Sequence, residues 1–451
     1  RSSDLTVLLW ERVVAWALVR FPDGSFLIDL KTLISNIMAK VLISFIGTGP
    51  LVNKGTLGEE KSAREYRRAS YHLGEENLGE YSFMAAALYE TQNIDKVILI
   101  GTAHCMWEEV YRYFQEKNGG VVDEDVYCEI AEHCEAATSK SELYIPHAKE
   151  IEAAIGKDAH LALIRYGVNE EEINENINII LQLNQLLSTG DELIVDVTHS
   201  FRSLPITIMN LLLYLRNVSS KNIKISHIYY GMIEMSKEYG YAPIVDLKKI
   251  LKLNDWIVGA MAFKQYGNAY QIAGLIQQED TDVTNRLKHF SDVMNLNHLY
   301  AISQETQSLR ALMKKDFDSM LPEMIVKPVV KDFLNNFKGT EQDPARFQYQ
   351  LAQWQFKHMN YTAALISLQE SILSYACQLA KHDPFDKDER QKIKDVICND
   401  KEFIPFELRG VYFEITKNRN VVAHALESNF SSGKIIESLR TSLITAGKYI
   451  N

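Results

Sequence analysis

The chain has 451 residues, 46% hydrophobic and 24% charged, which is long enough for two or three domains with separate cores. Its net charge of −11 excludes indiscriminate binding to polynucleotides, because such binding sums local attractions between phosphates and basic side chains. No apolar run approaches the roughly 20 residues of a membrane helix. Five cysteines at irregular spacing predict a reducing, cytoplasmic environment, and without Cys and His pairs at zinc spacing we predict no metal site.

Residues 1–37 form an N-terminal extension ahead of Met38, which directly precedes the first convincing strand. An artefact of the gene start and a genuine amphipathic addition fit this segment equally well. The first domain is therefore expected to begin at residue 38.

Residues 38–247 alternate between apolar runs of strand length and helical patterns, which is typical of an α/β domain with a parallel sheet. Helices are expected over Ser82–Glu90, over Asn169–Leu187 and after Pro205. The expected strands are Val41–Ile46, Val97–Ile100, Leu161–Ile164, Leu193–Val195, Ile223–Tyr230 and Ile244–Asp246, with Tyr66–His72 as an edge strand or hairpin arm.

Polar turns follow three of these strands. They contain Gly47, Thr48 and Gly49 after the first strand, Gly101 and Thr102 through Trp107 after another, and residues 198–202 after Val195-Asp196. Ligands of open α/β sheets bind beyond the carboxyl ends of the strands, so one site built from all three turns is expected. A plain structural turn explains the glycines equally well, and a Trp that opens a helix is more often a core anchor than a stacking platform.

The turn after Asp196 has the composition of an anion site. Helix N–H groups, the positive end of the helix dipole and four polar side chains are expected to meet there. Pro205 suits the first turn of the following helix, and Ser203 is its expected cap. The candidate ligand-binding residues of this turn are Thr198, His199, Ser200, Phe201 and Arg202.

The stretch Asp196–Arg202 resembles the ligand-binding signature of the CARF domain, the sensor of CRISPR-associated proteins that bind cyclic oligoadenylates. That signature is Asp, hydrophobic, Thr, His, small, aromatic or aliphatic, Arg. The resemblance implies a Rossmann-like fold and a cyclic oligoadenylate as activating ligand, with no other cofactor. Cys105 departs from the family pattern, which has a serine there, and this departure places one hydrogen bond in doubt.

Residues 248–451 follow a helical period almost throughout and predict an all-α domain. We expect an intermediate helical region over residues 256–333 and a compact bundle over residues 334–451. Polar breaks at residues 277–280 and 338–341 are expected loops, and Phe347–His358 and Tyr361–Ala380 are expected helices.

The second chemical motif is Arg419-Asn420-Val421-Val422-Ala423-His424. Arg419 and His424 lie about 140° apart around an ideal helix, which is poor geometry for a simple pair. The run resembles the catalytic motif of HEPN domains, helical ribonucleases that work as dimers. His424 is then the expected acid or base, Arg419 the phosphate clamp and Asn420 a positioning residue. A surface arginine beside a core-edge histidine is the structural alternative.

Together the two resemblances predict a cytoplasmic homodimer or higher oligomer of the CARF–HEPN type. Its expected activity is metal-independent endoribonuclease cleavage of single-stranded RNA, switched on by cyclic oligoadenylate in type III CRISPR defence. Two alternatives remain open: a ligand-sensing regulator with a non-catalytic helical domain, and a sensor that also degrades its cyclic ligand. Lys387, Arg390, Lys392, Lys394, Lys401 and Arg409 are expected to supply local attraction for RNA.

Overall fold

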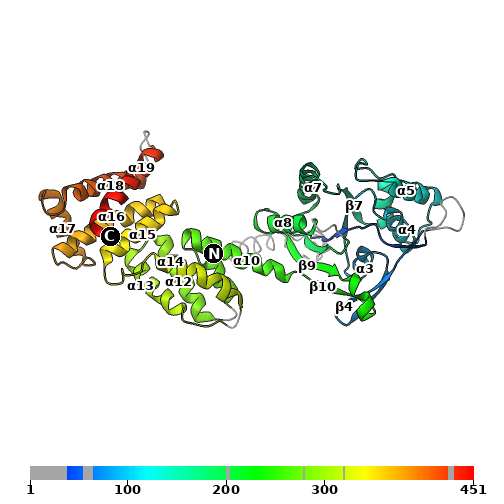
Figure 1. Cartoon of the computed structure of the whole chain (residues 1–451), viewed down its shortest axis with the longest axis horizontal. Helices are drawn as coiled ribbons and strands as arrows, with labels where there is room; N and C mark the ends of the chain where they lie inside the picture. Colours follow the sequence, from blue (N-terminus) through cyan, green and yellow to red (C-terminus); the bar gives the residue numbers. More distant parts are fainter. Residues whose placement is uncertain (1–37, 54–63, 200–203, 278–279, 318–319, 425–430) are drawn as a thin grey trace, which may run out of the picture. The chain divides into compact units, whose positions relative to one another are not determined.

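The computed structural model describes residues 38–53, 64–199, 204–277, 280–317, 320–424 and 431–451 (Figure 1). The chain divides into two compact units, one ending at Lys249 and the other beginning at Ile250. The sequence placed this division two residues earlier, between residues 247 and 248. The first unit is an α/β structure and the described part of the second is helical, as the predicted fold class requires.

An eight-stranded mixed sheet forms the centre of the first unit, in the order β5-β4-β10-β9-β8-β1-β6-β7. Five neighbours, from β9 to β7, are all parallel, whereas β10 is antiparallel to β9 and β5 to β4. β2 and β3 form a separate antiparallel ribbon. The strands are β1 (Lys40–Phe45), β2 (Leu51–Asn53), β3 (Glu65–Tyr66), β4 (Ala69–Leu73), β5 (Glu76–Tyr81), β6 (Lys96–Gly101), β7 (Asp158–Leu163), β8 (Glu192–Asp196), β9 (Lys224–Gly231) and β10 (Ala242–Asp246).

Helices complete the core of the first unit. Leu42, Val97 and Leu99 of the sheet belong to one apolar cluster with side chains of α3, α4, α5 and α6. α8 contacts β9 and α7. These helices are α3 (Met84–Thr91), α4 (Trp107–Lys117), α5 (Glu124–Ala136), α6 (Ala148–Ile155), α7 (Glu170–Gln182) and α8 (Leu204–Asn217), with the short α9 (Ser236–Tyr239), η1 (Leu183–Leu186) and η2 (Ile233–Met235).

The sequence located most of these elements but not the whole β4–β5 hairpin. The expected strand Tyr66–His72 is divided between β3 and β4, and β5 was not predicted. β5 is mostly polar, and Leu78 is its one buried residue, so it lacks the alternation that identifies a half-buried strand. β5 is a strand because it pairs with β4. The turn between the two strands contains Gly74, whose φ is +63°.

Two apolar cores organise the second unit. One includes Trp256, Phe290 and Trp354, and the other Leu368, Leu408 and Leu443. α15 contributes to both. The helices are α10 (Lys249–Tyr266), α11 (Tyr270–Ile276), α12 (Thr281–Leu296), α13 (Leu299–Leu312), the π-helix η3 (Pro322–Val326), α14 (Lys327–Asn335), α15 (Pro344–Lys357), α16 (Tyr361–Leu379), α17 (Lys387–Asn399), α18 (Phe406–His424) and α19 (Ser432–Ile450).

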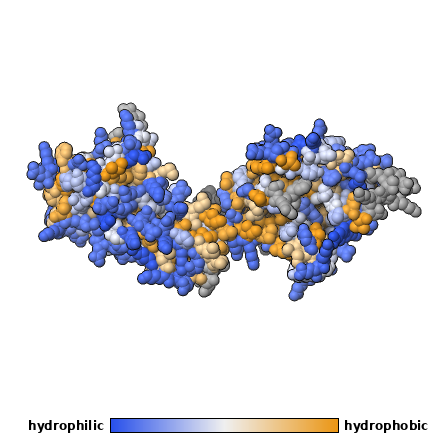
Figure 2. Space-filling model, in the orientation of Figure 1, coloured by the Kyte–Doolittle hydropathy of each residue, from blue (hydrophilic) through white to orange (hydrophobic). Residues whose placement is uncertain are grey.

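Exposed apolar side chains gather along α10, where Leu253, Ile257 and Met261 recur at helical spacing (Figure 2). Such a stripe is typical of a surface that contacts another segment or protein. α10 is nevertheless no membrane span, since none of the described helices is long and apolar enough to cross a bilayer.

We predict that Gly49→Ala destabilises the first unit more than Gly74→Ala does. Both glycines have positive φ, so both variants carry the same backbone strain. A Cβ on Gly49 would lie 2.1 Å from Met106 Cε and 2.7 Å from Tyr66 Cδ1, whereas a Cβ on Gly74 meets no atom of the described residues within 4 Å. The extra loss in the free energy of unfolding is expected to be about 1–3 kcal/mol by urea titration. Equal losses would contradict the packing shown for this loop.

Candidate functional site

The chain reverses its direction across the sheet at β1. Between β1 and β6 it forms the β2–β3 ribbon and the β4–β5 hairpin; β6 and β7 then lie on one side of β1, and β8 and β9 lie on the other. β1 is thus the switch point of the parallel strands, where a crevice is expected at their carboxyl ends. Two of the three predicted polar turns, those after Phe45 and Asp196, begin at this point.

A cavity of about 490 Å³ occupies the crevice. Five predicted site residues line it: Gly47, Thr48, Gly49, Thr198 and His199. The predicted residues Ser200, Phe201 and Arg202, and the expected cap Ser203, lie outside the described residues. Cys105, from the predicted turn after β6, also lines the cavity. The rest of the lining, which sequence analysis did not assign to the site, consists of Ile46, Pro50, Arg67, Ala69, Tyr71, Tyr81, Ser82 and Ile233.

Asp196 ties the two strands together beneath this cavity. Its buried carboxylate accepts hydrogen bonds from Ser44 Oγ of β1 at 2.5 Å and from the Thr198 amide at 2.9 Å. Burial raises the pKa of Asp196 to about 6, although both hydrogen bonds oppose this shift. Thr198 Oγ1 in turn accepts from the Gly231 amide at 2.8 Å. The turn after β8 is thereby fixed to β1 and β9.

His199 lines the cavity in its neutral form. The Met84 amide, in the first turn of α3, donates to His199 Nε2 over 3.3 Å, so the ring proton belongs on Nδ1. Burial lowers the pKa of His199 to about 4. A Cβ on Gly47 would lie 3.2 Å from His199 Cβ, which explains why the facing turn carries a glycine. His199 therefore provides an uncharged edge for a ligand.

The turn after β6 is placed differently from the prediction. Trp107 has no exposed surface, and its indole N–H donates to the Thr102 carbonyl at 2.9 Å. Gly101 packs against this ring, since a Cβ there would lie 2.7 Å from Trp107 Cζ2. The described lining of the cavity does not include Gly101, Thr102 or Trp107. The predicted ligand-stacking role of Trp107 is wrong for this structure, because the ring is a core anchor.

Cys105 is the residue of that turn that reaches the cavity wall. Its thiol donates to the Ile46 carbonyl at 2.8 Å and accepts from the Thr102 amide at 3.2 Å. The sulfur thus makes hydrogen bonds of its own within the wall, and the bond expected of the family's serine stays untested. Burial raises the pKa of Cys105 to about 11, so the group is a neutral thiol at physiological pH.

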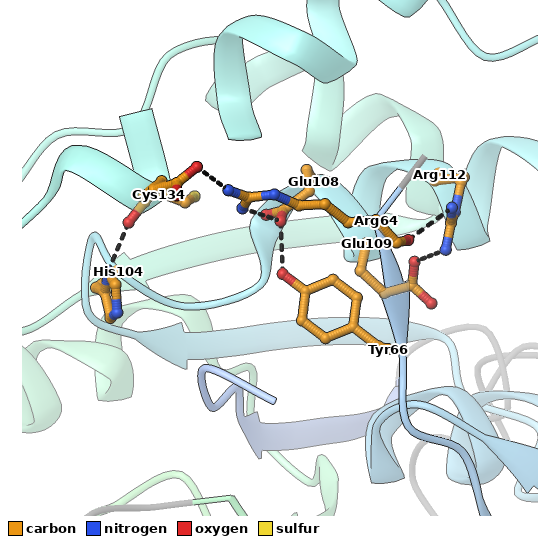
Figure 3. A network of polar contacts seen from close by, with 8 residues as sticks. Arg64, Tyr66, His104, Glu108, Glu109, Arg112 and Cys134 are labelled. Carbon is orange, nitrogen blue, oxygen red and sulfur yellow. Dashed lines mark hydrogen bonds and ion pairs between the residues drawn. The ribbon is translucent and has the colours of Figure 1, made fainter. Parts of the chain in front are cut away.

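A second cavity of about 250 Å³ shares Thr48, Gly49 and Cys105 with the first. Its wall contains Arg64, which is held in a buried network (Figure 3). Arg64 Nη1 lies 3.0 Å from the fully buried Glu108, which also accepts from Tyr66 Oη at 2.5 Å. Carboxylates in the first turn of α4 suit the positive end of its dipole. The network therefore anchors the segment that leads into β3 and on to Arg67.

The network also extends behind the first cavity. Arg112 pairs with Glu109 and donates to the Arg64 carbonyl at 3.2 Å (Figure 3). Glu109 accepts from the cavity residue Ser82 at 2.7 Å. Burial raises the pKa of Glu109, while Arg112 and Ser82 oppose the shift. The same charges at the start of α4 therefore hold Ser82 and the segment that leads to Arg67, two parts of the cavity wall that sequence analysis missed.

The candidate catalytic motif lies at the end of α18 in the second unit. Arg419 and Asn420 are exposed, and Arg419 Nη1 donates to Asn420 Oδ1 at 3.2 Å. Val422 packs against the second core of this unit. His424 is the last residue of α18, and its side chain lies outside the described set. The structure thus places the arginine and asparagine on a surface, and their catalytic role stays a prediction.

Two of the basic residues expected to attract RNA have structural roles. Arg390 pairs with Glu370 and donates to the Pro384 carbonyl at 2.6 Å. Arg409 donates to the carbonyls of Ile397 and Cys398, each at 2.8 Å, near the end of α17. Their guanidinium groups hold the bundle together, and their attraction for RNA stays a prediction.

Comparisons with known proteins show what each part of the chain resembles. Residues 41–234 match the family model for the CARF domain of the CRISPR system endoribonuclease Csx1, and residues 252–341 match the model for the second domain of the CRISPR-associated protein MJ1674. The first unit is thus similar to the CARF domains of CRISPR-associated proteins. The CARF resemblance and the predicted fold class are confirmed.

Particular relatives extend this picture. The CRISPR-associated protein MJ1674 of Methanocaldococcus jannaschii is 32% identical over 410 residues, which cover 86% of this chain and 62% of the relative. The chain therefore spans less than two thirds of that relative's length. A structure of Enterococcus italicus Csm6 bound to cyclic hexa-2'-fluoro-hexa-dAMP aligns with a TM-score of 0.34 and 12% identity over 92% of this chain and 95% of that chain.

We predict that His199→Asn changes the pH dependence of stability. The folded-state pKa of about 4 lies below the ordinary value of 6.5, so the unfolded chain takes up the proton first as the pH falls. His199 therefore costs stability between pH 6.5 and pH 4. Asp196 works in the opposite direction below pH 6, but it is present in both proteins.

Urea titrations at pH 7 and pH 5 measure this difference. The wild type should lose on the order of 1 kcal/mol relative to His199→Asn between these two pH values. Parallel pH profiles for the two proteins would show that His199 is not held neutral in the folded state.

Proposed function

We propose that this chain is an endoribonuclease that a cyclic oligoadenylate activates through the first unit. The observation that carries the proposal is the cavity at the reversal point of a CARF domain, where two of the turns predicted to bind ligand meet. Sensing belongs to this cavity, and cleavage belongs to the motif on α18.

The cavity has the chemistry of a nucleotide site. Gly47 and Gly49 remove side-chain bulk, so that a phosphate can approach the backbone closely. Arg67 supplies an exposed cation on the wall, while His199 stays uncharged and provides hydrogen-bonding and stacking edges. Among the described residues the site therefore has one cation for phosphates and several neutral polar groups for bases and sugars. This combination suits a ligand in which nucleosides and phosphates alternate.

We further propose that the working form is a homodimer or a higher oligomer with two-fold symmetry. A cyclic oligoadenylate has rotational symmetry of its own, so two copies of the cavity can bind one ring across a two-fold axis. The same symmetry would bring two copies of the α18 motif together on single-stranded RNA.

The α18 motif supports cleavage without a metal. His424 would accept the proton of the RNA 2'-hydroxyl or protonate the 5'-oxygen that leaves. Arg419, which is exposed and permanently charged, would stabilise the negative charge that develops on the phosphate. Asn420 contacts Arg419 and would position it.

Ligand binding tests the sensor. His199→Ala removes a ring from the cavity wall and is expected to weaken binding of cyclic oligoadenylate about 10-fold or more, as measured by isothermal titration calorimetry. His160→Ala is the matched control, because His160 lies on β7 and contacts Asp158 away from the cavity. Equal affinities for the two variants would remove the turn after β8 from the ligand site.

Cleavage tests the effector. His424→Ala and Arg419→Ala should each reduce ligand-activated cleavage of labelled RNA by at least about 100-fold while ligand affinity is unchanged. Lys434→Ala, an exposed change on α19, should cleave like the wild type. Activity should persist in EDTA, products should end in 2',3'-cyclic phosphate, and a DNA copy should resist cleavage because it lacks the nucleophilic hydroxyl.

The same assays distinguish the alternatives. Ligand binding without RNA cleavage would assign the chain as a sensing regulator with a non-catalytic helical unit. Conversion of the cyclic ligand to linear products, followed by chromatography, would assign ligand degradation to the sensor. Loss of RNA cleavage in EDTA would falsify the metal-independent mechanism.

A further inference from the structure

Tyr71 is an unexplained polar residue in the wall of the first cavity. It lies on β4 with no exposed surface, and its phenol oxygen has no hydrogen-bond partner among the described residues. A buried hydroxyl without a partner typically costs about 1–3 kcal/mol, and a phenylalanine at this position would avoid that cost. Tyr71 is nevertheless part of the cavity lining, so a ligand in the cavity is the partner considered for its hydroxyl.

The surroundings of Tyr71 keep its hydroxyl protonated. A Cβ on Gly231 would lie 2.9 Å from Tyr71 Cε1 and 3.3 Å from Thr198 Oγ1, so the ring edge lies beside the predicted ligand turn. Burial, followed by the charge of Asp196, raises the pKa of Tyr71 well above its ordinary value. The phenol is thus a neutral O–H that can both donate and accept.

The charges around Tyr71 select the kind of group it would bind. Asp196 acts on Tyr71 as a negative charge, which disfavours a phosphate beside it. Arg67, the cation in the described part of the cavity wall, is exposed, and it is the better partner for phosphates. A neutral group of the nucleoside is left for the phenol.

We propose that the Tyr71 hydroxyl hydrogen-bonds the ribose 2'-hydroxyl of the bound nucleotide and so makes the cavity selective for ribonucleotides. This inference rests on the proposed function. In a cyclic 3',5'-linked oligonucleotide the 3' and 5' oxygens are esterified, so the 2'-hydroxyl is the free hydroxyl of each sugar. The adenine edge is the other neutral hydrogen-bonding group, and the experiment separates the two.

The test compares wild type and Tyr71→Phe with three rings of the same size: cyclic oligoadenylate, its 2'-deoxy analogue, and an analogue with purine in place of adenine. The wild type should bind the ribose ring about 10-fold more tightly than the deoxy ring, the effect of one hydrogen bond. Tyr71→Phe should bind these two rings equally, while its preference for adenine over purine stays at the wild-type value. Tyr144→Phe, at an exposed tyrosine outside the described cavity lining, should keep both preferences.

Stability provides an independent readout. Because the phenol oxygen has no partner in the described part of the protein, Tyr71→Phe should unfold at the same urea concentration as wild type or at a higher one. A marked loss of stability would show that the hydroxyl has a structural partner, and this would overturn the proposal.

Each binding outcome leads to a different conclusion. A wild-type preference for ribose that survives in Tyr71→Phe, or no such preference in wild type, overturns the role of Tyr71 and leaves ligand sensing intact. Loss of the adenine preference in Tyr71→Phe moves the contact to the base and overturns the hydroxyl assignment. If no ring binds to the wild type, the proposed function itself fails.

Discussion

The hydrogen bond between Ser44 and Asp196 is the constraint on which the rest of the first unit depends. It joins β1 to β8 at the point where the chain changes direction, so the two turns that line the cavity begin from one fixed position. A carboxylate buried this deeply is expensive unless its oxygens are hydrogen-bonded. Asp196 uses both of them, one on the neighbouring strand and one on its own turn. The same contacts therefore stabilise the fold and position the site.

Much of the first unit could be predicted from sequence because parallel strands are short, apolar and followed by polar turns. Asp196, Thr198 and His199 were placed correctly at a strand end for this reason. Tyr71 was missed as a site residue because it lies on the β4–β5 hairpin, which only strand pairing brings to the cavity, and Arg67 was missed because it lies on the connection that leads into this hairpin. Trp107 illustrates the opposite error: its turn predicted a ligand contact, but the residue takes the core position that is more common for a Trp at the start of a helix.

The helical unit was predictable as a class but not in its internal division. The expected boundary between residues 333 and 334 falls at the end of α14, yet α15 packs on both sides of any such division. Phe347, Leu351 and Trp354 enter one core, while Tyr349 and Ala352 enter the other. A helix with two apolar faces has no single hydrophobic stripe, so its periodicity does not reveal that it belongs to two clusters. The separate C-terminal bundle over residues 334–451 therefore stays a prediction, because α15 joins the two cores.

Cys105 gives the cavity wall a chemical property that a serine would not have. Its thiol is protonated, hydrogen-bonded and shared by both cavities, so it should react slowly with alkylating reagents while the turns are closed. Reaction then requires a transient opening of the wall, whereas the exposed Cys398 is accessible to the reagent without any opening. The alkylation rate of Cys105, measured against that of Cys398 in the same chain, therefore reports how often the wall shared by the two cavities opens.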